Sequence, residues 1–309
     1  METVILIGPQ ASQPNIRKAL QLSGVEGRVC AVTAGWQERA GELAALREHL
    51  DREVVNLELY YRAEEVFEQD PEFFSAHRQR QNLLRELQTI YRTRLYYHQE
   101  AVLRLLEMQG TDSLLTRERE AAIESVRQLD RQHVERTREI RHEFEEEWKS
   151  HERPSIARQI SKVRRIVASC SAILVAGGHV AVLLNRLRLF NLTPLLWEKP
   201  VIAWSAGAMA LSERVILFHD SPPQGPGAAE VLEAGLGRIR NIVPLPHAEK
   251  RLRLQVPHRV AFFASRFRPA QCLAMDGGAL LCGDGESWLS SENLVRLTES
   301  GNLRTELQP

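Results

Sequence analysis

The segment Ala203-Trp204-Ser205-Ala206-Gly207 places a serine between an apolar run and a run of small residues. The apolar run 201–204 is typical of a buried strand, and the small residues after Ser205 favour a helix. A serine at such a tight strand-to-helix turn presents its hydroxyl above the sheet, as the nucleophile of a hydrolase does. Capping of the helix is the other common use of a serine there. Because the turn follows an apolar strand directly, we interpret Ser205 as a candidate nucleophile.

A pair of glycines follows a second apolar run in the same manner. Gly177-Gly178 comes directly after the predicted strand 172–176. Paired glycines allow the backbone to approach a ligand closely and leave amide hydrogens available for developing negative charge. We therefore predict an oxyanion hole made by the backbone N–H groups of Gly178 and Ala206. The other residues expected to border the substrate are Gly177, His179 and Trp204.

A serine nucleophile also needs a base and a group that orients the base. His247 lies between a proline and an alanine after an apolar run, in a rigid segment leaving a strand. His219 and Asp220 are adjacent, and neighbouring side chains of an extended segment point to opposite sides, so only one of them can face the site. We predict His247 as the base and Asp220 as the orienting carboxylate, and interpret His258 as a surface histidine.

These motifs resemble those of the dipeptidase E and cyanophycinase-like serine peptidases. The core of that family is similar to class I glutamine amidotransferases, with serine in place of the catalytic cysteine. The resemblance covers the N-terminal strands and residues 166–285. The matching features are Gly177-Gly178, the Ser-Ala-Gly-Ala sequence from Ser205 to Ala208, an acidic residue at Asp220, and Pro246-His247.

The resemblance implies hydrolysis of small peptides, often near acidic residues, and hence a basic residue in the pocket. The candidates for that role are Arg186, Arg188 and Arg214. Two positions depart from the family. His179 replaces the Asn, Asp or Gln that often follows the glycines, and Pro246 replaces the acid that often precedes the histidine in cyanophycin-degrading members. Cyanophycin is therefore not predicted as the substrate.

The elements that must position these residues have an α/β pattern. Strands that are apolar throughout alternate with helices, which predicts a mostly parallel sheet covered on both faces, a three-layer sandwich. Within it we expect a helix over 36–50. We assign residues 1–60 and 151–309 to one discontinuous core. Residues 61–150 are rich in Arg, Glu, Gln and Leu, with apolar residues recurring every three or four positions, so they predict an inserted long helical hairpin that reverses at 110–113.

Composition excludes several classes of function. The 40 basic and 40 acidic side chains among 309 residues give no net charge, so nucleic acid is not an expected partner. No apolar run approaches the roughly 20 residues that span a bilayer, and the start lacks a signal-peptide pattern. The four cysteines form no Cys-x-x-Cys pair and the histidines no ligand pattern, so we expect no metal, no cofactor and a cytoplasmic protein.

The sequence thus predicts a serine peptidase or amidohydrolase acting on a small peptide or amide. An alternative is a binding or regulatory module, non-catalytic or activated by a partner. Such a module would assemble through 61–150, as a homodimer or with another protein. The apolar stripes of 61–150 fit a coiled-coil interface and an intramolecular hairpin equally well. Glutamine amidotransferase activity is disfavoured, because those enzymes rely on a thiolate where this chain has Ser205.

Overall fold

The computed structural model describes residues 2–11, 13–219 and 229–305. Within these residues the centre of the protein is a seven-stranded sheet in the order β11-β10-β1-β5-β4-β2-β3. The strands β1, β5, β4, β2 and β3 are parallel to one another, and β10 and β11 add an antiparallel edge beside β1. The strands are β1 (Val4–Ile7), β2 (Val29–Val32), β3 (Val54–Asn56), β4 (Ile173–Val175), β5 (Val201–Trp204), β10 (Leu280–Gly283) and β11 (Trp288–Glu292).

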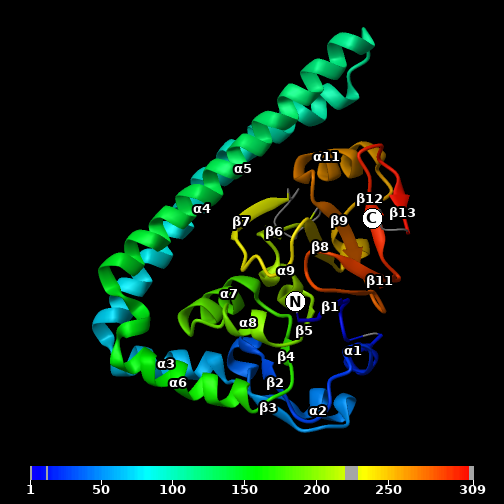
Figure 1. The fold of residues 1–309 in the computed structure, drawn as a ribbon. Coiled ribbons are helices and arrows are strands. Elements are labelled where there is room, and N and C mark those ends of the chain that lie inside the picture. The colour runs from blue at the N-terminus through cyan, green and yellow to red at the C-terminus, as the bar shows by residue number, and fades with distance from the viewer. Residues whose placement is uncertain (1, 12, 220–228, 306–309) are drawn as a thin grey trace.

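Helices cover both faces of this sheet, because successive residues of a strand point to opposite faces and both sets are apolar. In β1, Val4 and Leu6 join one buried cluster, and Ile5 and Ile7 join the other. One face packs on α1 (Ile16–Leu22) and α2 (Ala44–Leu50). The other packs on α6 (Pro154–Ala168), α7 (Val180–Leu189), the short α8 (Leu195–Glu198) and α9 (Ala206–Leu211). The predicted three-layer α/β sandwich is confirmed (Figure 1).

The prediction of a single helix over 36–50 is wrong. A 3-10 helix, η1 (Ala34–Arg39), comes first, and α2 begins only at Ala44. Gln37 interrupts the helical backbone with φ 58° and ψ −125°. Trp36, directly before this interruption, borders the cavity described below.

Two smaller sheets lie beyond the carboxyl ends of the central strands. One has the order β13-β12-β9-β8, in which β8 (Ile242–Pro246) and β9 (Gln271–Met275) are parallel neighbours. The other pairs β6 (Arg214–Leu217) with β7 (Glu230–Ala234). The remaining elements are α10 (Ala248–Arg251), α11 (Pro257–Phe267), β12 (Val295–Leu297) and β13 (Leu303–Arg304).

The predicted long hairpin is also confirmed. It consists of α4 (Pro71–Glu107) and α5 (Asp112–Trp148), preceded by α3 (Leu59–Gln69) and followed by the 3-10 turn η2 (Ser150–Glu152). Asp70 caps α4 by accepting a hydrogen bond from the backbone N–H of Phe73 at 3.2 Å, and Pro71 occupies the first turn. The far end of the hairpin extends past the core (Figure 1).

The middle of the hairpin is attached to the core by a buried polar cluster. Arg266 of α11 makes two hydrogen bonds to Asp130 of α5, at 2.7 and 2.8 Å, and both side chains are 1% exposed. Tyr91 of α4 donates to Asp130 at 2.8 Å and accepts from Arg266 at 3.0 Å. The backbone N–H of Val231 in β7 also donates to Tyr91, at 3.0 Å. The hairpin is therefore fixed to β7 and α11 at its middle.

Among the described helices, none combines the length and apolar character required to cross a membrane.

Candidate active site

Ser205 lies at the turn between β5 and α9 with an unusual backbone. Its φ is 50° and its ψ −120°, a conformation that costs a non-glycine residue of the order of 1–3 kcal/mol. Its side chain makes no capping hydrogen bond to α9, so the structure gives no support to the capping interpretation. Gly207 follows at a point where a Cβ would lie 2.2 Å from the carbonyl oxygen of Val175. The turn is thus held in a strained form, and the Ser205 hydroxyl makes no hydrogen bond to another residue of the described ranges.

The paired glycines lie directly beside this serine. A Cβ on Gly177 would come within 2.8 Å of the Ser205 Cβ, so a larger residue would displace the serine. Gly178 has φ +106°, and a Cβ there would lie 2.3 Å from the carbonyl oxygen of Gly35. The Gly178 turn and the first turn of α9 at Ala206 border one cavity with Ser205. This arrangement fits the predicted oxyanion hole.

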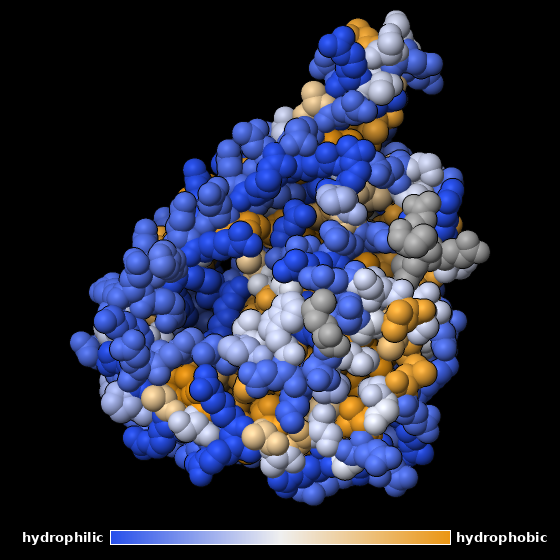
Figure 2. Space-filling view, viewed as in Figure 1, coloured by the Kyte–Doolittle hydropathy of each residue, from blue (hydrophilic) through white to orange (hydrophobic). Residues whose placement is uncertain are grey.

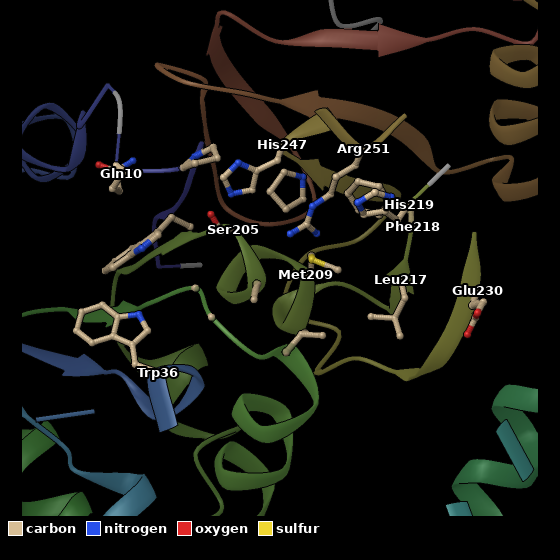
Figure 3. A pocket seen from close by; sticks show the side chains of 18 of the residues that line it. Gln10, Trp36, Ser205, Met209, Leu217, Phe218, His219, Glu230, His247 and Arg251 are labelled. Carbon is tan, nitrogen blue, oxygen red and sulfur yellow. The ribbon is translucent and has the colours of Figure 1, made fainter. Parts of the chain in front are cut away.

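His247 borders the same cavity, at the end of β8 and the start of α10. In Figure 3 the Ser205 hydroxyl and the His247 ring lie on the same side of the pocket. Burial lowers the pKa of His247, and the positive charges of Arg251 and Lys250 lower it further. The imidazole is therefore neutral at pH 7 and able to accept a proton. No hydrogen bond joins Ser205 to His247 within the described residues, and such contacts often tighten only when substrate binds.

The structure points to a carboxylate that sequence reasoning missed. Pro246 pairs with Met275 across the parallel strands β8 and β9, which brings Asp276 to the first turn of α10, after His247. The Asp276 carboxylate accepts from the backbone N–H of Glu249, at 3.3 and 3.4 Å from its two oxygens. Burial raises the pKa of Asp276, and this backbone hydrogen bond opposes the rise. A half-buried carboxylate is therefore fixed at the turn that carries the histidine.

The cavity around Ser205 has a volume of about 960 Å³. Both the core and the α4 helix of the hairpin line it, and Figure 2 shows the surface hollowed between these two regions. Besides Ser205, the residues that border it are Pro9, Gln10, Ala11, Trp36, Arg92, Leu95, Tyr96, Gly177, Gly178, Val180, Trp204, Ala206, Met209, Leu217, Phe218, His219, Glu230, Pro246, His247 and Arg251.

The basic residue that borders the cavity beside His247 is not one of the three candidates expected from the resemblance. Arg186 pairs with Glu64 at 3.1 Å and Arg188 with Glu233, and neither borders the cavity. Arg214 does not border it either. Arg251 takes this place, one helical turn after His247, with its guanidinium 5.8 Å from the ring centre of Phe218. Within the described residues, Arg251 has no carboxylate partner.

Other predicted site residues have different outcomes. Asp220 lies outside the described residues, while its neighbour His219 borders the cavity. His179 does not border it: its Nδ1 accepts from the backbone N–H of Val182 at 3.3 Å and so caps α7. Trp204 borders the cavity with 6% of its surface exposed.

A metal centre or a thiolate nucleophile finds no support in the described part of the chain. No group of three or more His, Cys, Asp or Glu residues there could hold a metal ion. The four cysteines are free, and none of them borders the cavity.

No protein-family model and no curated protein matches the chain. Among solved structures, the chain is similar to the crystal structure of a peptidase from an acI-B1 Actinobacterium. The identity is 13%, the TM-score is 0.47, and the alignment covers 97% of this chain and 91% of that chain. A similarity of this extent carries no functional inference.

Proposed function

We propose that this protein is a serine peptidase or amidohydrolase that acts on small peptides or amides, with Ser205 as nucleophile. The observation that carries the proposal is the strained backbone of Ser205, at φ 50° and ψ −120°, beside paired glycines and on the same cavity as His247. Strained non-glycine residues are concentrated at functional sites. The motifs resembling dipeptidase E and cyanophycinase-like peptidases support the same assignment.

The proposed reaction has two stages. The Ser205 Oγ attacks the carbonyl carbon while His247 accepts its proton, and the backbone N–H groups of Gly178 and Ala206 bind the oxyanion. Each such donor contributes on the order of 3 kcal/mol. His247 then gives the proton to the leaving nitrogen as the C–N bond breaks. A water molecule, deprotonated by His247, hydrolyses the acyl-serine, and the proton returns to Ser205.

We further propose that Asp276 orients His247, in place of or together with Asp220. The β8–β9 register supports this role, because it fixes the carboxylate beside the histidine turn. Arg251 is the proposed binding residue for an anionic group of the substrate. Its half-buried guanidinium faces the cavity without a carboxylate partner among the described residues.

The test compares wild type, Ser205→Ala and Ser161→Ala on a mixture of short peptides that includes acidic and isopeptide-linked members. Ser161 is exposed on α6, outside the cavity, and serves as the matched control. Mass spectrometry should show cleavage by wild type and Ser161→Ala and none by Ser205→Ala. Equal cleavage by Ser205→Ala, or none by wild type, would contradict the proposal.

A second candidate is a module that assembles through its hairpin, as a homodimer or with a protein partner. The observation in its favour is a pair of exposed apolar side chains spaced by seven residues on α4. Leu83 and Ile90 are 49% and 50% exposed, and this spacing is that of a coiled-coil seam. Sedimentation velocity of wild type and Ile90→Lys tests the homodimer. A monomer at all concentrations of wild type would exclude it.

A further inference from the structure

One face of α4 reaches the cavity that contains Ser205. Arg92, Leu95 and Tyr96 border this cavity, at the three- and four-residue spacing of a single helix face. The neighbouring residues Arg94 and Tyr97 do not border it. We propose that this face of α4 is a remote subsite, which binds a peptide at residues away from the scissile bond. The proposal rests on the peptidase function proposed above.

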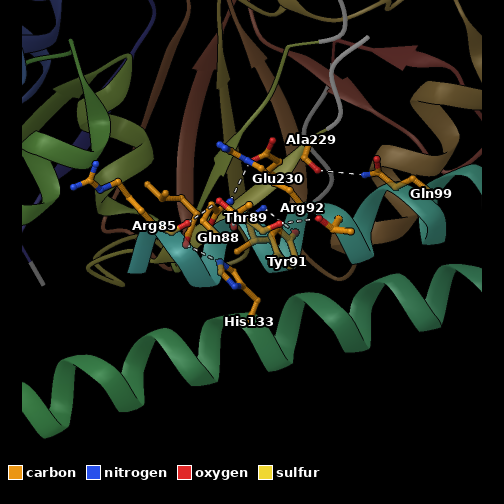
Figure 4. Close-up of polar contacts among 12 residues, drawn as sticks. Arg85, Gln88, Thr89, Tyr91, Arg92, Gln99, His133, Ala229 and Glu230 are labelled. Atoms are coloured by element: carbon orange, nitrogen blue, oxygen red, sulfur yellow. Dashed lines mark hydrogen bonds and ion pairs between the residues drawn. The ribbon is translucent and has the colours of Figure 1, made fainter. Parts of the chain in front are cut away.

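The subsite wall is held rigidly against β7 (Figure 4). Glu230 Oε2 accepts from Arg92 Nε at 2.6 Å and from Gln88 Nε2 at 3.0 Å. Gln99 Nε2 donates to the carbonyl oxygen of Ala229 at 3.3 Å, and His133 Nε2 contacts the carbonyl oxygen of Leu232 at 3.0 Å. With the Tyr91 contacts, these bonds connect Ala229 and the first residues of β7 to both helices of the hairpin. Binding energy gained on α4 is therefore not spent on ordering the wall.

The side chains of the subsite indicate which part of a peptide it fits. Tyr96 is 59% exposed at the cavity, so its ring is available to an apolar or aromatic side chain. Arg92 uses its Nε for Glu230, while its terminal nitrogens make no hydrogen bond within the described residues. Their N–H groups can donate to peptide carbonyl oxygens. Because Glu230 balances the charge of Arg92, the subsite suits a neutral peptide segment.

The size of the cavity fits a substrate longer than a dipeptide. Its volume of about 960 Å³ is near the upper end of the roughly 300–1,000 Å³ of typical ligand pockets. In Figure 3, Glu230 lies far from Ser205, with Leu217 and Phe218 between them. A peptide that contacts both regions must therefore extend along the cavity.

Tyr96 and Tyr97 offer a matched pair of variants. They are adjacent and exposed, with ring centres 5.2 Å apart, but only Tyr96 borders the cavity. We would measure kcat and KM on peptides of two to eight residues that share one scissile bond. Tyr96→Ala should raise KM for the longest peptides by roughly tenfold and leave the shortest unchanged. Tyr97→Ala should match wild type on all of them. Equal effects of the two variants would overturn the subsite.

Binding of the same peptides to Ser205→Ala, with and without Tyr96→Ala, separates the two proposals. Peptide binding that depends on Tyr96, without cleavage by wild type, supports the subsite and contradicts the hydrolase. Cleavage with no difference between Tyr96→Ala and Tyr97→Ala contradicts the subsite and leaves the hydrolase standing. The absence of both cleavage and binding overturns both proposals.

Discussion

The Ser205 turn and the α4 helix border one cavity, but they are built in different ways. At the turn, the backbone sets the geometry: Ser205 has φ 50°, and Gly177 and Gly178 allow contacts that a Cβ would block. On α4 the backbone is an ordinary helix, and side chains such as Arg92 and Tyr96 provide the surface. Geometry set by the backbone leaves a local signature in the sequence, whereas a helix face acquires its role only from what it packs against.

The two regions are also supported differently. The strands β5 and β4 beneath the turn consist of buried apolar residues. Removal of this apolar surface from water is the main stabilisation of the region. The middle of the hairpin depends on the buried cluster of Arg266, Asp130 and Tyr91. Breaking such a pair leaves a charge buried without a partner, which is costly. The comparison therefore predicts chemical defects from changes at the turn and defects of attachment from changes in the cluster.

The largest effect is expected for Asp276→Asn. If Asp276 orients His247, loss of its charge should lower kcat by about 10²-fold or more, with little change in the free energy of unfolding. Glu249→Gln is the control, because its exposed carboxylate lies on the same turn, two residues after the histidine. Steady-state kinetics of both variants measures this. A larger loss of kcat for Glu249→Gln than for Asp276→Asn would show that Asp276 does not orient His247.

Asp130→Leu should act on the hairpin. It leaves the Arg266 charge buried without a carboxylate to balance it, so the free energy of unfolding in urea should fall by about 3–5 kcal/mol. The double variant Asp130→Leu/Arg266→Met removes both charges and should recover most of that loss. Glu124→Gln, which removes the exposed carboxylate that pairs with Arg127 and Arg131, should cost no more than about 1 kcal/mol. A loss for Asp130→Leu as small as that for Glu124→Gln would show that the buried cluster does not hold the hairpin.

The smallest predicted effect is on the pH dependence of kcat/KM. The proposed base must be neutral, so kcat/KM should fall as pH falls through the pKa of His247, which burial, Arg251 and Lys250 place below 6.5. Arg251→Gln removes one of the repelling positive charges. The pKa of His247 should then rise, and the acid limb of the kcat/KM profile should move to higher pH. An acid limb that moves to lower pH, or stays in place, would show that the titration of His247 does not cause this limb.

Much of the core could be predicted because its signals are local. Apolar runs bounded by glycine or proline marked the strands, and the hairpin followed from its three- and four-residue periodicity. The structure then brings Ser205, Gly178 and His247 to one cavity. The break in the helix expected over 36–50 was not predictable, since it depends on a positive φ at Gln37, a residue with no special preference for that conformation.

The missed residues of the site depend on contacts between distant segments. Asp276 follows His247 by many residues, and only the pairing of Pro246 with Met275 places the two together. Arg186 and Arg188 are pocket cations in the prediction from sequence, but in the structure they form ion pairs with Glu64 and Glu233. The role of Arg251 follows from the start of α10 at the end of β8, a junction that the apolar run before His247 did not reveal.

Covalent labelling tests the central claim most directly. The intact protein is treated with a fluorophosphonate, which reacts with activated serine hydroxyls, and the modified peptide is located by mass spectrometry. A single adduct on Ser205, absent from Ser205→Ala and slowed in His247→Gln, is the predicted result. No adduct at Ser205, or equal labelling of Ser205 in wild type and His247→Gln, would contradict its assignment as a nucleophile activated by His247.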